Sequence, residues 1–152
     1  MIANPIIATA SIILREEQRM IKPLTQTDYR VTKQLFQDVF YMGEDPYFVT
    51  AWSSRDKGTS FGYWTHDVLI GAVIVSGPPD GDTCSRLDYI FVHETFRNSG
   101  IGTQLLKAVL SLCPHIRLTP VDDPAVKQWY KKHGFHATKP VQCNEVYARY
   151  TK

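Results

Sequence analysis

The stretch 87–112, LDYIFVHETFRNSGIGTQLLKAVLSL, carries the clearest structural signals in the chain. Its first six residues are mostly aromatic or β-branched and predict a buried strand. Residues 101–112 repeat apolar side chains at helical spacing and predict a helix with one buried face. That face would consist of Ile101, Leu105, Ala108, Val109 and Leu112. A short polar segment with two glycines, 97–102, connects the strand to the helix.

This strand, turn and helix are suited to bind an anion. The first backbone N–H groups of a helix have no partner within the helix, and the helix dipole adds positive charge there. Glycine lets the backbone approach a phosphate closely, because it has no Cβ. Arg97 adds a fixed positive charge that can bind a phosphate through two hydrogen bonds. The stretch alone therefore predicts a phosphate-bearing cofactor.

Length and composition limit the class of protein. A chain of 152 residues with 43% hydrophobic and 21% charged residues is typical of one globular domain. We expect an N-terminal arm or extra strand at 1–17 and a single domain at 18–152. A net charge of +2 is too small for a nucleic-acid-binding surface.

Cysteine and histidine usage indicates neither a disulfide framework nor a metal site. The three cysteines, Cys84, Cys113 and Cys143, are an odd number without close pairing. His133 and His136 are not accompanied by the paired cysteines of a zinc site. No apolar run approaches the ~20 residues that span a bilayer. We therefore expect a cytoplasmic protein without a membrane partner.

The remaining segments predict further strands and helices. Thr25 and Asp28 fit a capping box at the start of a helix. The turn His66-Asp67 would close a tight hairpin. The buried face of the first helix would consist of Val31, Leu35, Phe36 and Val39. The expected segments are a strand at 20–24, a helix ending near Gly43, strands at 59–65, 68–76 and 116–119, and final strands at 135–137 and 145–150.

Two further regions complete the prediction. Asp123 and Pro124 mark the start of a helix that ends at Gly134. The aromatic-rich residues 44–55 could form a helix or a loop. Early hairpins and later strand–helix–strand units imply the α/β class, with one mixed, mostly antiparallel sheet. About six or seven strands and about four helices, on both faces, are expected.

Two common phosphate-binding patterns do not fit the glycine turn. An ATP-binding loop of the Walker type needs Lys-Ser or Lys-Thr after its last glycine, but Thr103-Gln104 follows here. A dinucleotide fingerprint needs a third glycine where this chain has Leu105, although Asp122 lies where a ribose-binding acid would fall. Only about 50 residues follow the turn, too few for the rest of a doubly wound sheet.

Two short motifs occur together in a known family. Residues 97–102, RNSGIG, fit the pattern Arg or Gln, two variable residues, Gly, one residue, then Gly or Ala. Residues 130–135, YKKHGF, fit Tyr-x-x-x-Gly-Phe at the end of a helix. In this order and separation the motifs resemble the signatures of the GNAT superfamily of acyl-CoA N-acetyltransferases. The resemblance extends over roughly residues 18–150 and implies the family's fold and acetyl-CoA as cofactor.

The resemblance also assigns residues to roles. Backbone N–H groups of 98–103 would bind the pyrophosphate, the strand edge at 90–92 would pair with the pantetheine arm, and the Val92 amide would be the oxyanion donor. Tyr130 would protonate the departing thiolate as general acid. The family often has an Asn just before the second helix, where this chain has Asp122-Asp123-Pro124. A contact of this segment with the cofactor must therefore be made differently. The implied cofactor-binding residues are Ile90, Phe91, Val92, Arg97, Asn98, Ser99, Gly100, Ile101, Gly102, Thr103 and Asp123.

The general base and the acceptor stay open between alternatives. Asp88, His93 and Glu94 are candidates for the base, and each could equally be a polar residue flanking the strand. Spermidine/spermine-type acetyltransferases carry Glu at the place of Asp88, which favours a small cationic amine such as a polyamine. The alternatives are a protein lysine, an N-terminus, an aminoglycoside, or a non-catalytic CoA-binding module. The family's frequent dimers make a homodimer a further expectation. Acidic residues near the acceptor cleft would include Glu44, Asp45, Asp80 and Asp82.

Overall fold

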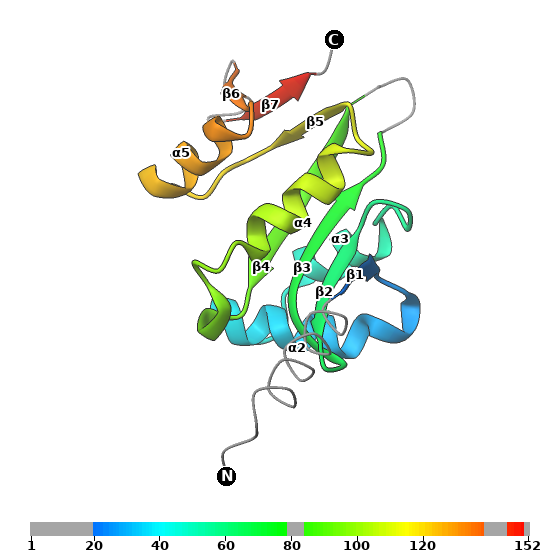
Figure 1. Cartoon of the computed structure of the whole chain (residues 1–152). Helices are drawn as coiled ribbons and strands as arrows, with labels where there is room; N and C mark the ends of the chain where they lie inside the picture. Colours follow the sequence, from blue (N-terminus) through cyan, green and yellow to red (C-terminus); the bar gives the residue numbers. More distant parts are fainter. Residues whose placement is uncertain (1–19, 79–83, 139–145, 151–152) are drawn as a thin grey trace, which may run out of the picture.

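The computed structural model of the chain describes residues 20–78, 84–138 and 146–150. In this part of the chain seven strands form one sheet, and α-helices cover both of its faces (Figure 1). The strands are β1 (Met20–Pro23), β2 (Phe61–Thr65), β3 (Val68–Ser76), β4 (Ser85–Val92), β5 (His115–Leu118), β6 (His136–Ala137) and β7 (Tyr147–Tyr150). The α-helices are α2 (Tyr29–Phe40), α3 (Pro46–Ser53), α4 (Ile101–Leu110) and α5 (Pro124–Lys132). The predicted arm at 1–17 and Cys143 lie outside the described residues.

The strand order is β1-β2-β3-β4-β5-β7-β6. Neighbouring strands are antiparallel except β4 and β5, which are parallel and are connected through α4. A parallel pair needs such a crossover, because a hairpin cannot return the chain in the same direction. The predicted mixed, mostly antiparallel sheet with four flanking α-helices is confirmed. Among the described helices, none has both the length and the apolar character of a membrane span.

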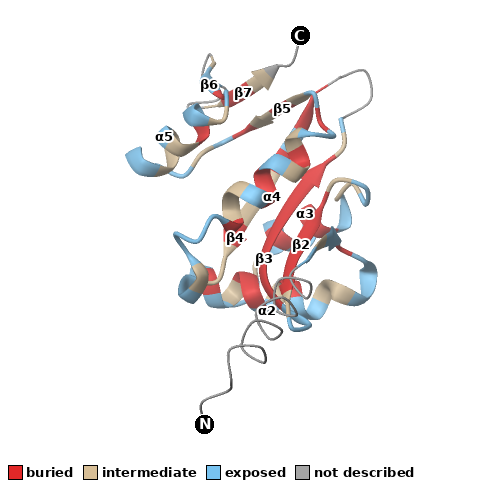
Figure 2. Ribbon diagram, in the orientation of Figure 1, coloured by how far each residue is buried: buried red, intermediate tan, exposed pale blue. Residues whose placement is uncertain are grey.

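The central strand β3 is buried along nearly its whole length (Figure 2). Its side chains alternate between two hydrophobic cores, as the period of a strand requires. Val73 and Val75 belong to the core under α4 and α5, whereas Ala72 and Ile74 belong to the core under α2 and α3. The strand β3 therefore contributes side chains to the cores on both faces of the sheet.

Two helices end earlier than predicted, and one buried face is shifted. Val31 is 46% exposed, because Thr32 takes the buried position and its hydroxyl donates to the Asp28 carbonyl at 2.8 Å. The helix α2 ends at Phe40, before Gly43, with Tyr41 in the left-handed conformation at φ 52°. Leu112 is 56% exposed, beyond the end of α4. Its predicted burial was wrong, because the chain tightens after α4 and buries the next residue, a cysteine, instead.

Several local signals are confirmed. Thr25 and Asp28 form the capping box, although it opens the 3-10 helix η1 (Gln26–Asp28) that leads into α2. His66 and Asp67 both have positive φ, as a tight hairpin turn between β2 and β3 requires. Residues 44–55, left open between helix and loop, contain α3. Gly134 ends the last helix at φ 90°.

Two glycines with open surroundings differ in backbone conformation, and this difference gives a stability test. A Cβ at Gly100 or at Gly43 would meet no atom within 4 Å, but Gly100 has φ +84°. An L-residue in the left-handed region is destabilised by about 1–2 kcal/mol. We expect Gly100→Ala to lower the free energy of unfolding by that amount in urea denaturation.

The matched control is Gly43→Ala. Its backbone lies outside the positive-φ region, so the substitution should change the free energy of unfolding by no more than about 1 kcal/mol, in the stabilising direction. Equal losses in the two variants would contradict the assignment of strain to the conformation of Gly100.

Candidate active site

The site begins where the parallel strands β4 and β5 separate. Among the described residues these strands pair only at Ser85↔Ile116 and Arg86↔Arg117. Beyond this point, 87–92 of β4 form one wall of a cleft of about 830 Å³. The end of α2, the turn before α4 and its first residues, the end of β5 with the residues that follow it, and α5 complete the lining.

The backbone of β4 directs peptide groups that do not pair with β3 toward this cleft. The His93 amide donates to the Ile70 carbonyl at 2.8 Å, and Val92 lies opposite Gly71. Because hydrogen-bonded and non-bonded pairs alternate in an antiparallel ladder, Val92 and Ile90 direct their N–H and C=O groups away from β3. These groups face the side on which β5 has moved away. A ligand chain placed there can pair with β4 as a missing strand would.

The turn before α4 presents a second set of donors. Asn98 and Gly100 have positive φ, at 62° and 84°. The Gln104 amide donates to the Gly100 carbonyl at 3.0 Å, so the amides of the three residues 101–103 precede the helical ladder. The Arg97 side chain is exposed, and its Nε donates to the Val92 carbonyl at 3.3 Å. This leaves the outer guanidinium N–H groups available to an anion.

Tyr130 lies in α5 and lines the same cleft. Its side chain is 5% exposed and packs edge-on against Phe135, with ring centroids 5.4 Å apart. Burial raises the pKa of Tyr130 from 10.0 to about 12. The phenol therefore keeps its proton throughout the neutral range.

Most of the predicted cofactor-binding residues line this cleft. They are Ile90, Phe91, Val92, Arg97, Asn98, Gly100, Ile101, Gly102 and Thr103. Ser99 and Asp123 are not among the lining residues. The Ser99 hydroxyl donates to the Phe96 carbonyl, and the Asp123 carboxylate caps α5 by accepting from the Ala125 amide at 2.9 Å.

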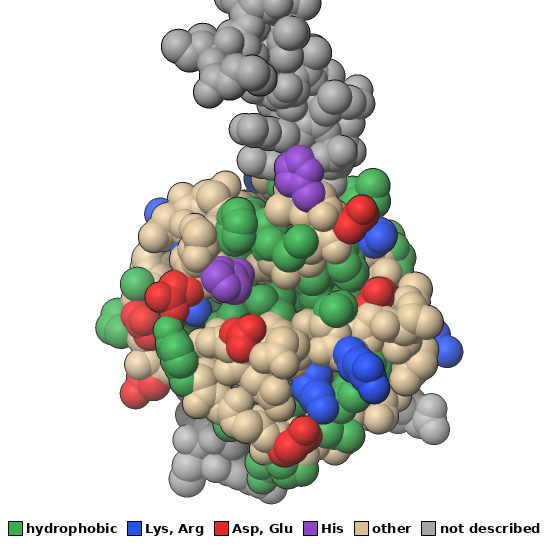
Figure 3. All heavy atoms as spheres, turned by 90° about the horizontal axis from the view of Figure 1, so that it is seen from below, with side chains coloured by type: hydrophobic (Ala, Val, Ile, Leu, Met, Phe, Trp, Pro, Cys, Tyr) green, Lys and Arg blue, Asp and Glu red, His purple; other side chains and the backbone are tan. Residues whose placement is uncertain are grey.

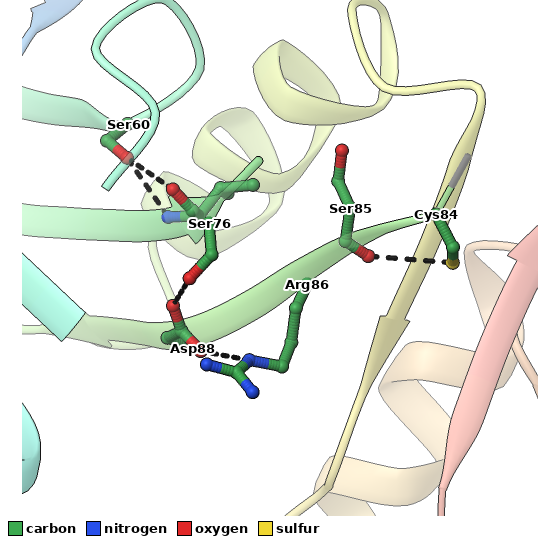
Figure 4. A network of polar contacts seen from close by, with 7 residues as sticks. Ser60, Ser76, Cys84, Ser85, Arg86 and Asp88 are labelled. Atoms are coloured by element: carbon green, nitrogen blue, oxygen red, sulfur yellow. Dashed lines mark hydrogen bonds and ion pairs between the residues drawn. The ribbon is translucent and has the colours of Figure 1, made fainter. Parts of the chain in front are cut away.

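Asp88 lines the cleft, and its carboxylate is hydrogen-bonded to neighbouring side chains. The register between β3 and β4 shifts at Asp88, so that it is the extra residue of a β-bulge. Its carboxylate accepts from the Ser76 hydroxyl and from Arg86 Nε, the latter at 2.6 Å (Figure 4). The Asp88 side chain is 9% exposed. Its negative charge is therefore largely compensated within the sheet.

His93 and Glu94 lie beside a neighbouring hollow of about 650 Å³. The Glu94 carboxylate accepts a hydrogen bond from the Tyr41 hydroxyl, and this contact raises the pKa of Tyr41. Seen from the end of the molecule where β4 finishes, apolar side chains gather near the middle of the face, with charged side chains around them (Figure 3). Val39 lines both the hollow and the cleft, so the two are adjacent. The three base candidates are thus divided between two places.

Sequence reasoning missed several lining residues. The apolar walls come from segments far apart in the chain, and no local pattern marks them as part of a site. They include Val39, Phe40, Leu87, Tyr89, Phe96, Leu118, Val121, Val126 and Trp129. Trp129 is the exception, because its place directly before Tyr130 was a usable signal. In the part of the chain that the structure describes, His, Cys, Asp and Glu residues do not cluster as a metal site would require.

Comparison with solved structures gives the same fold with low sequence identity. A protein from Pyrococcus horikoshii OT3, PH1933, has a TM-score of 0.75 at 17% identity and covers 88% of this chain and 99% of its own. The ribosomal-protein-S18-alanine N-acetyltransferase of Escherichia coli has a TM-score of 0.71 at 16% identity and covers 86% of this chain and 92% of its own. Arabidopsis thaliana Naa50, in complex with a CoA bisubstrate analogue, has a TM-score of 0.67 at 20% identity and covers 86% of this chain and 96% of its own.

Sequence comparison identifies the family. Comparison with curated protein sequences finds no significant match. The family model described as acetyltransferase (GNAT) family matches residues 25–135, which include both motifs and most of the chain. The fold, the cleft with its glycine turn and this match confirm the predicted family and cofactor. The chain belongs to the GNAT acetyltransferase family and is an acetyl-CoA-dependent N-acetyltransferase.

Proposed function

We propose that this cleft transfers an acetyl group from acetyl-CoA to a primary amine of a small cationic acceptor. The observation that carries the proposal is the convergence of three kinds of group on one cleft. These are the outward-facing amide of Val92, the N-terminus of α4 and the phenol of Tyr130. When bound, acetyl-CoA supplies a thioester whose carbonyl carbon takes up the amine and whose thiol leaves.

The residues of the cleft would divide the work of binding and catalysis. The amides of 101–103 and Arg97 would bind the pyrophosphate, since both provide donors to an anion. Ile90 would pair with the pantetheine amides along the open edge of β4, since the Val92 carbonyl already accepts from Arg97. The Val92 N–H would donate to the thioester oxygen as negative charge develops there. Held in this way, the reacting carbon lies in a fixed place for the amine.

Tyr130 would act as the general acid. Its burial and its pKa of about 12 support this role, because the phenol is protonated when the thiolate forms. In this role the phenol of Tyr130 would give its proton to the departing thiolate. It would regain one from the attacking amine, which must lose a proton on forming its new bond.

Two acidic side chains in the hollow beside the cleft favour a cationic acceptor. Glu94 and Asp38 both line it, and their recorded partners are neutral, the Tyr41 hydroxyl and the Gln34 amide. Neither charge is compensated by these contacts, so both can attract an ammonium group. An acceptor with a second cationic group could hold it there while its reacting amine extends past Val39 into the cleft. Glu94 and His93 are also the base candidates nearest to that path.

The other acids that motivated a polyamine acceptor support it less. Asp88 is paired with Arg86, Glu44 forms an ion pair with Lys33 at 3.2 Å, and Asp45 caps α3 through the Tyr47 amide. Asp80 and Asp82 lie outside the described residues. The cationic acceptor is therefore proposed on the basis of Glu94 and Asp38 rather than on Asp88.

A second candidate acceptor is the α-amine of a peptide. Two structurally similar proteins are described as a ribosomal-protein-S18-alanine N-acetyltransferase and as a complex with the bisubstrate analogue CoA-Ac-MVNAL. Tyr41 and Met42 follow the end of α2, line the hollow and expose 80% and 46% of their surface, so an apolar peptide side chain could pack there. An α-amine has a pKa of about 7.7–8.0 and needs less help from a base.

Removal of the Tyr130 hydroxyl should slow the chemical step. We expect Tyr130→Phe to lower kcat about 10²-fold or more while KM for acetyl-CoA changes little, since proton transfer by a positioned group contributes about this much. Because the pKa of Tyr130 is raised to about 12, the phenol stays protonated up to pH 10. Any fall in the wild-type rate below pH 10 should therefore also occur in the variant. Steady-state rates between pH 6 and pH 10 provide the measurement.

The control for this prediction is Tyr63→Phe. Tyr63 is also 5% exposed in the same core but lies in β2 and does not line the cleft. It should leave kcat unchanged. A Tyr130→Phe enzyme with wild-type kcat would rule out the general-acid role.

An amine panel tests the acceptor. We expect turnover with spermidine and related polyamines, and Glu94→Gln should raise KM for spermidine about fivefold, since one partly screened charge pair contributes about 1 kcal/mol. The control is Asp67→Asn. Asp67 lies in the β2–β3 turn and lines neither the cleft nor the hollow, so the variant should leave KM for spermidine unchanged. Turnover of peptides but not of any polyamine would instead favour the peptide α-amine.

A further inference from the structure

A direct contact connects the two motif-bearing helices at the cleft. The indole Nε1 of Trp129, in α5, donates to the hydroxyl oxygen of Thr103, in the first turn of α4, at 3.1 Å. Both residues line the cleft. Trp129 directly precedes Tyr130, and their rings pack with centroids 4.9 Å apart. The glycine turn and the phenol are thus connected through one side chain.

The contact also orients the Thr103 hydroxyl. An indole N–H can only donate, so the Thr103 oxygen is the acceptor and its own proton is left to donate elsewhere. Other helical threonines use that proton within the helix: Thr32 and Thr50 donate to the carbonyls four residues before them, at 2.8 and 3.0 Å. For Thr103 no such bond is recorded among the described residues. Its proton is therefore available to a ligand in the cleft.

The indole ring also covers the glycine turn. A Cβ at Gly102 would lie 3.7 Å from the Trp129 Cζ2 atom, an ordinary packing distance. On its other side, Trp129 packs against His133 with ring centroids 5.4 Å apart. The indole is therefore fixed between α5 and the first turn of α4, and rotation of its ring would break the hydrogen bond to Thr103.

From this geometry we propose that Trp129 is a positioning residue, which orients the Thr103 hydroxyl to donate a hydrogen bond to a phosphate of the bound CoA. The proposal deepens the proposed function, on which it rests for the location of the pyrophosphate. The indole does not touch the phosphate in this account and acts through Thr103. A hydroxyl that already accepts a hydrogen bond is polarised and becomes a better donor.

The test compares binding of CoA with binding of pantetheine, which lacks the phosphates, by titration calorimetry. We expect Trp129→Phe and Thr103→Val each to weaken CoA binding about tenfold to a hundredfold, the scale of one hydrogen bond to a charged group. The double variant should be no weaker than Thr103→Val, because both changes remove the same donor. Thr103→Ser, which keeps the hydroxyl, should bind CoA nearly as wild type does, and pantetheine binding should be equal in all variants.

The matched control is Trp64→Phe. Trp64 is a buried tryptophan in β2 whose Nε1 has no hydrogen-bond partner among the described residues. It should leave CoA binding unchanged. Wild-type CoA affinity in Trp129→Phe, additive losses in the double variant, or an equal loss for pantetheine would each overturn the proposal. Because the readout is binding, failure of the proposed acetyl transfer would be seen separately, as absence of turnover in a wild-type enzyme that binds CoA.

Discussion

The active site depends on the early separation of β4 from β5. Two parallel strands that pair at only two positions leave the rest of β4 without a neighbour on that side. Its backbone donors and acceptors still need partners, because an unpaired buried peptide group is destabilising. The sheet therefore contains a place for an extended, amide-bearing ligand, and the pantetheine arm of CoA has that chemistry. An uninterrupted pair of strands would leave no cleft for the cofactor.

The same separation brings the other groups together. Because α4 crosses from β4 to β5, its N-terminus lies at the mouth of the cleft, where its unpaired amides can meet a phosphate. The helix α5 follows β5 and places Tyr130 in the cleft. Burial in the core beneath α5 keeps the phenol protonated. The N-terminus of α4 and the phenol of Tyr130 thus meet at one cleft because of one feature of the strand topology.

The parts of the site that the sequence could predict are local. The turn at 97–102 and the end of α5 at 130–135 each have contiguous signals, and the capping box, the hairpin and the element order have them as well. The structure agrees with these predictions to within a few residues. A contiguous motif does not tell whether a polar side chain is used by its own helix or turn, as the Asp123 carboxylate and the Ser99 hydroxyl are. The predicted contact of Ser99 was its backbone N–H, and the roles of both residues toward the cofactor stay predictions.

The parts that could not be predicted arise from contacts between distant residues. The β-bulge at Asp88 and its contact with Ser76 depend on how β3 and β4 align. The bond from Tyr41 to Glu94 joins residues 53 positions apart and follows from a left-handed Tyr41 that no glycine marks. Trp129 and Thr103, 26 positions apart, meet only after α5 packs beside α4. Packing of the elements, rather than their local propensity, decides each of these contacts.

The central claim is that the outward-facing edge of β4 pairs with the cofactor. Amide hydrogen exchange by NMR, with and without CoA, tests it residue by residue. The account predicts that the Ile90 and Val92 amides exchange fast in the free protein and become protected on binding CoA. The Phe91 and His93 amides, which face β3, should be protected in both states. Protection of all four amides without CoA, or no change at Ile90 and Val92 when CoA binds, would contradict the claim.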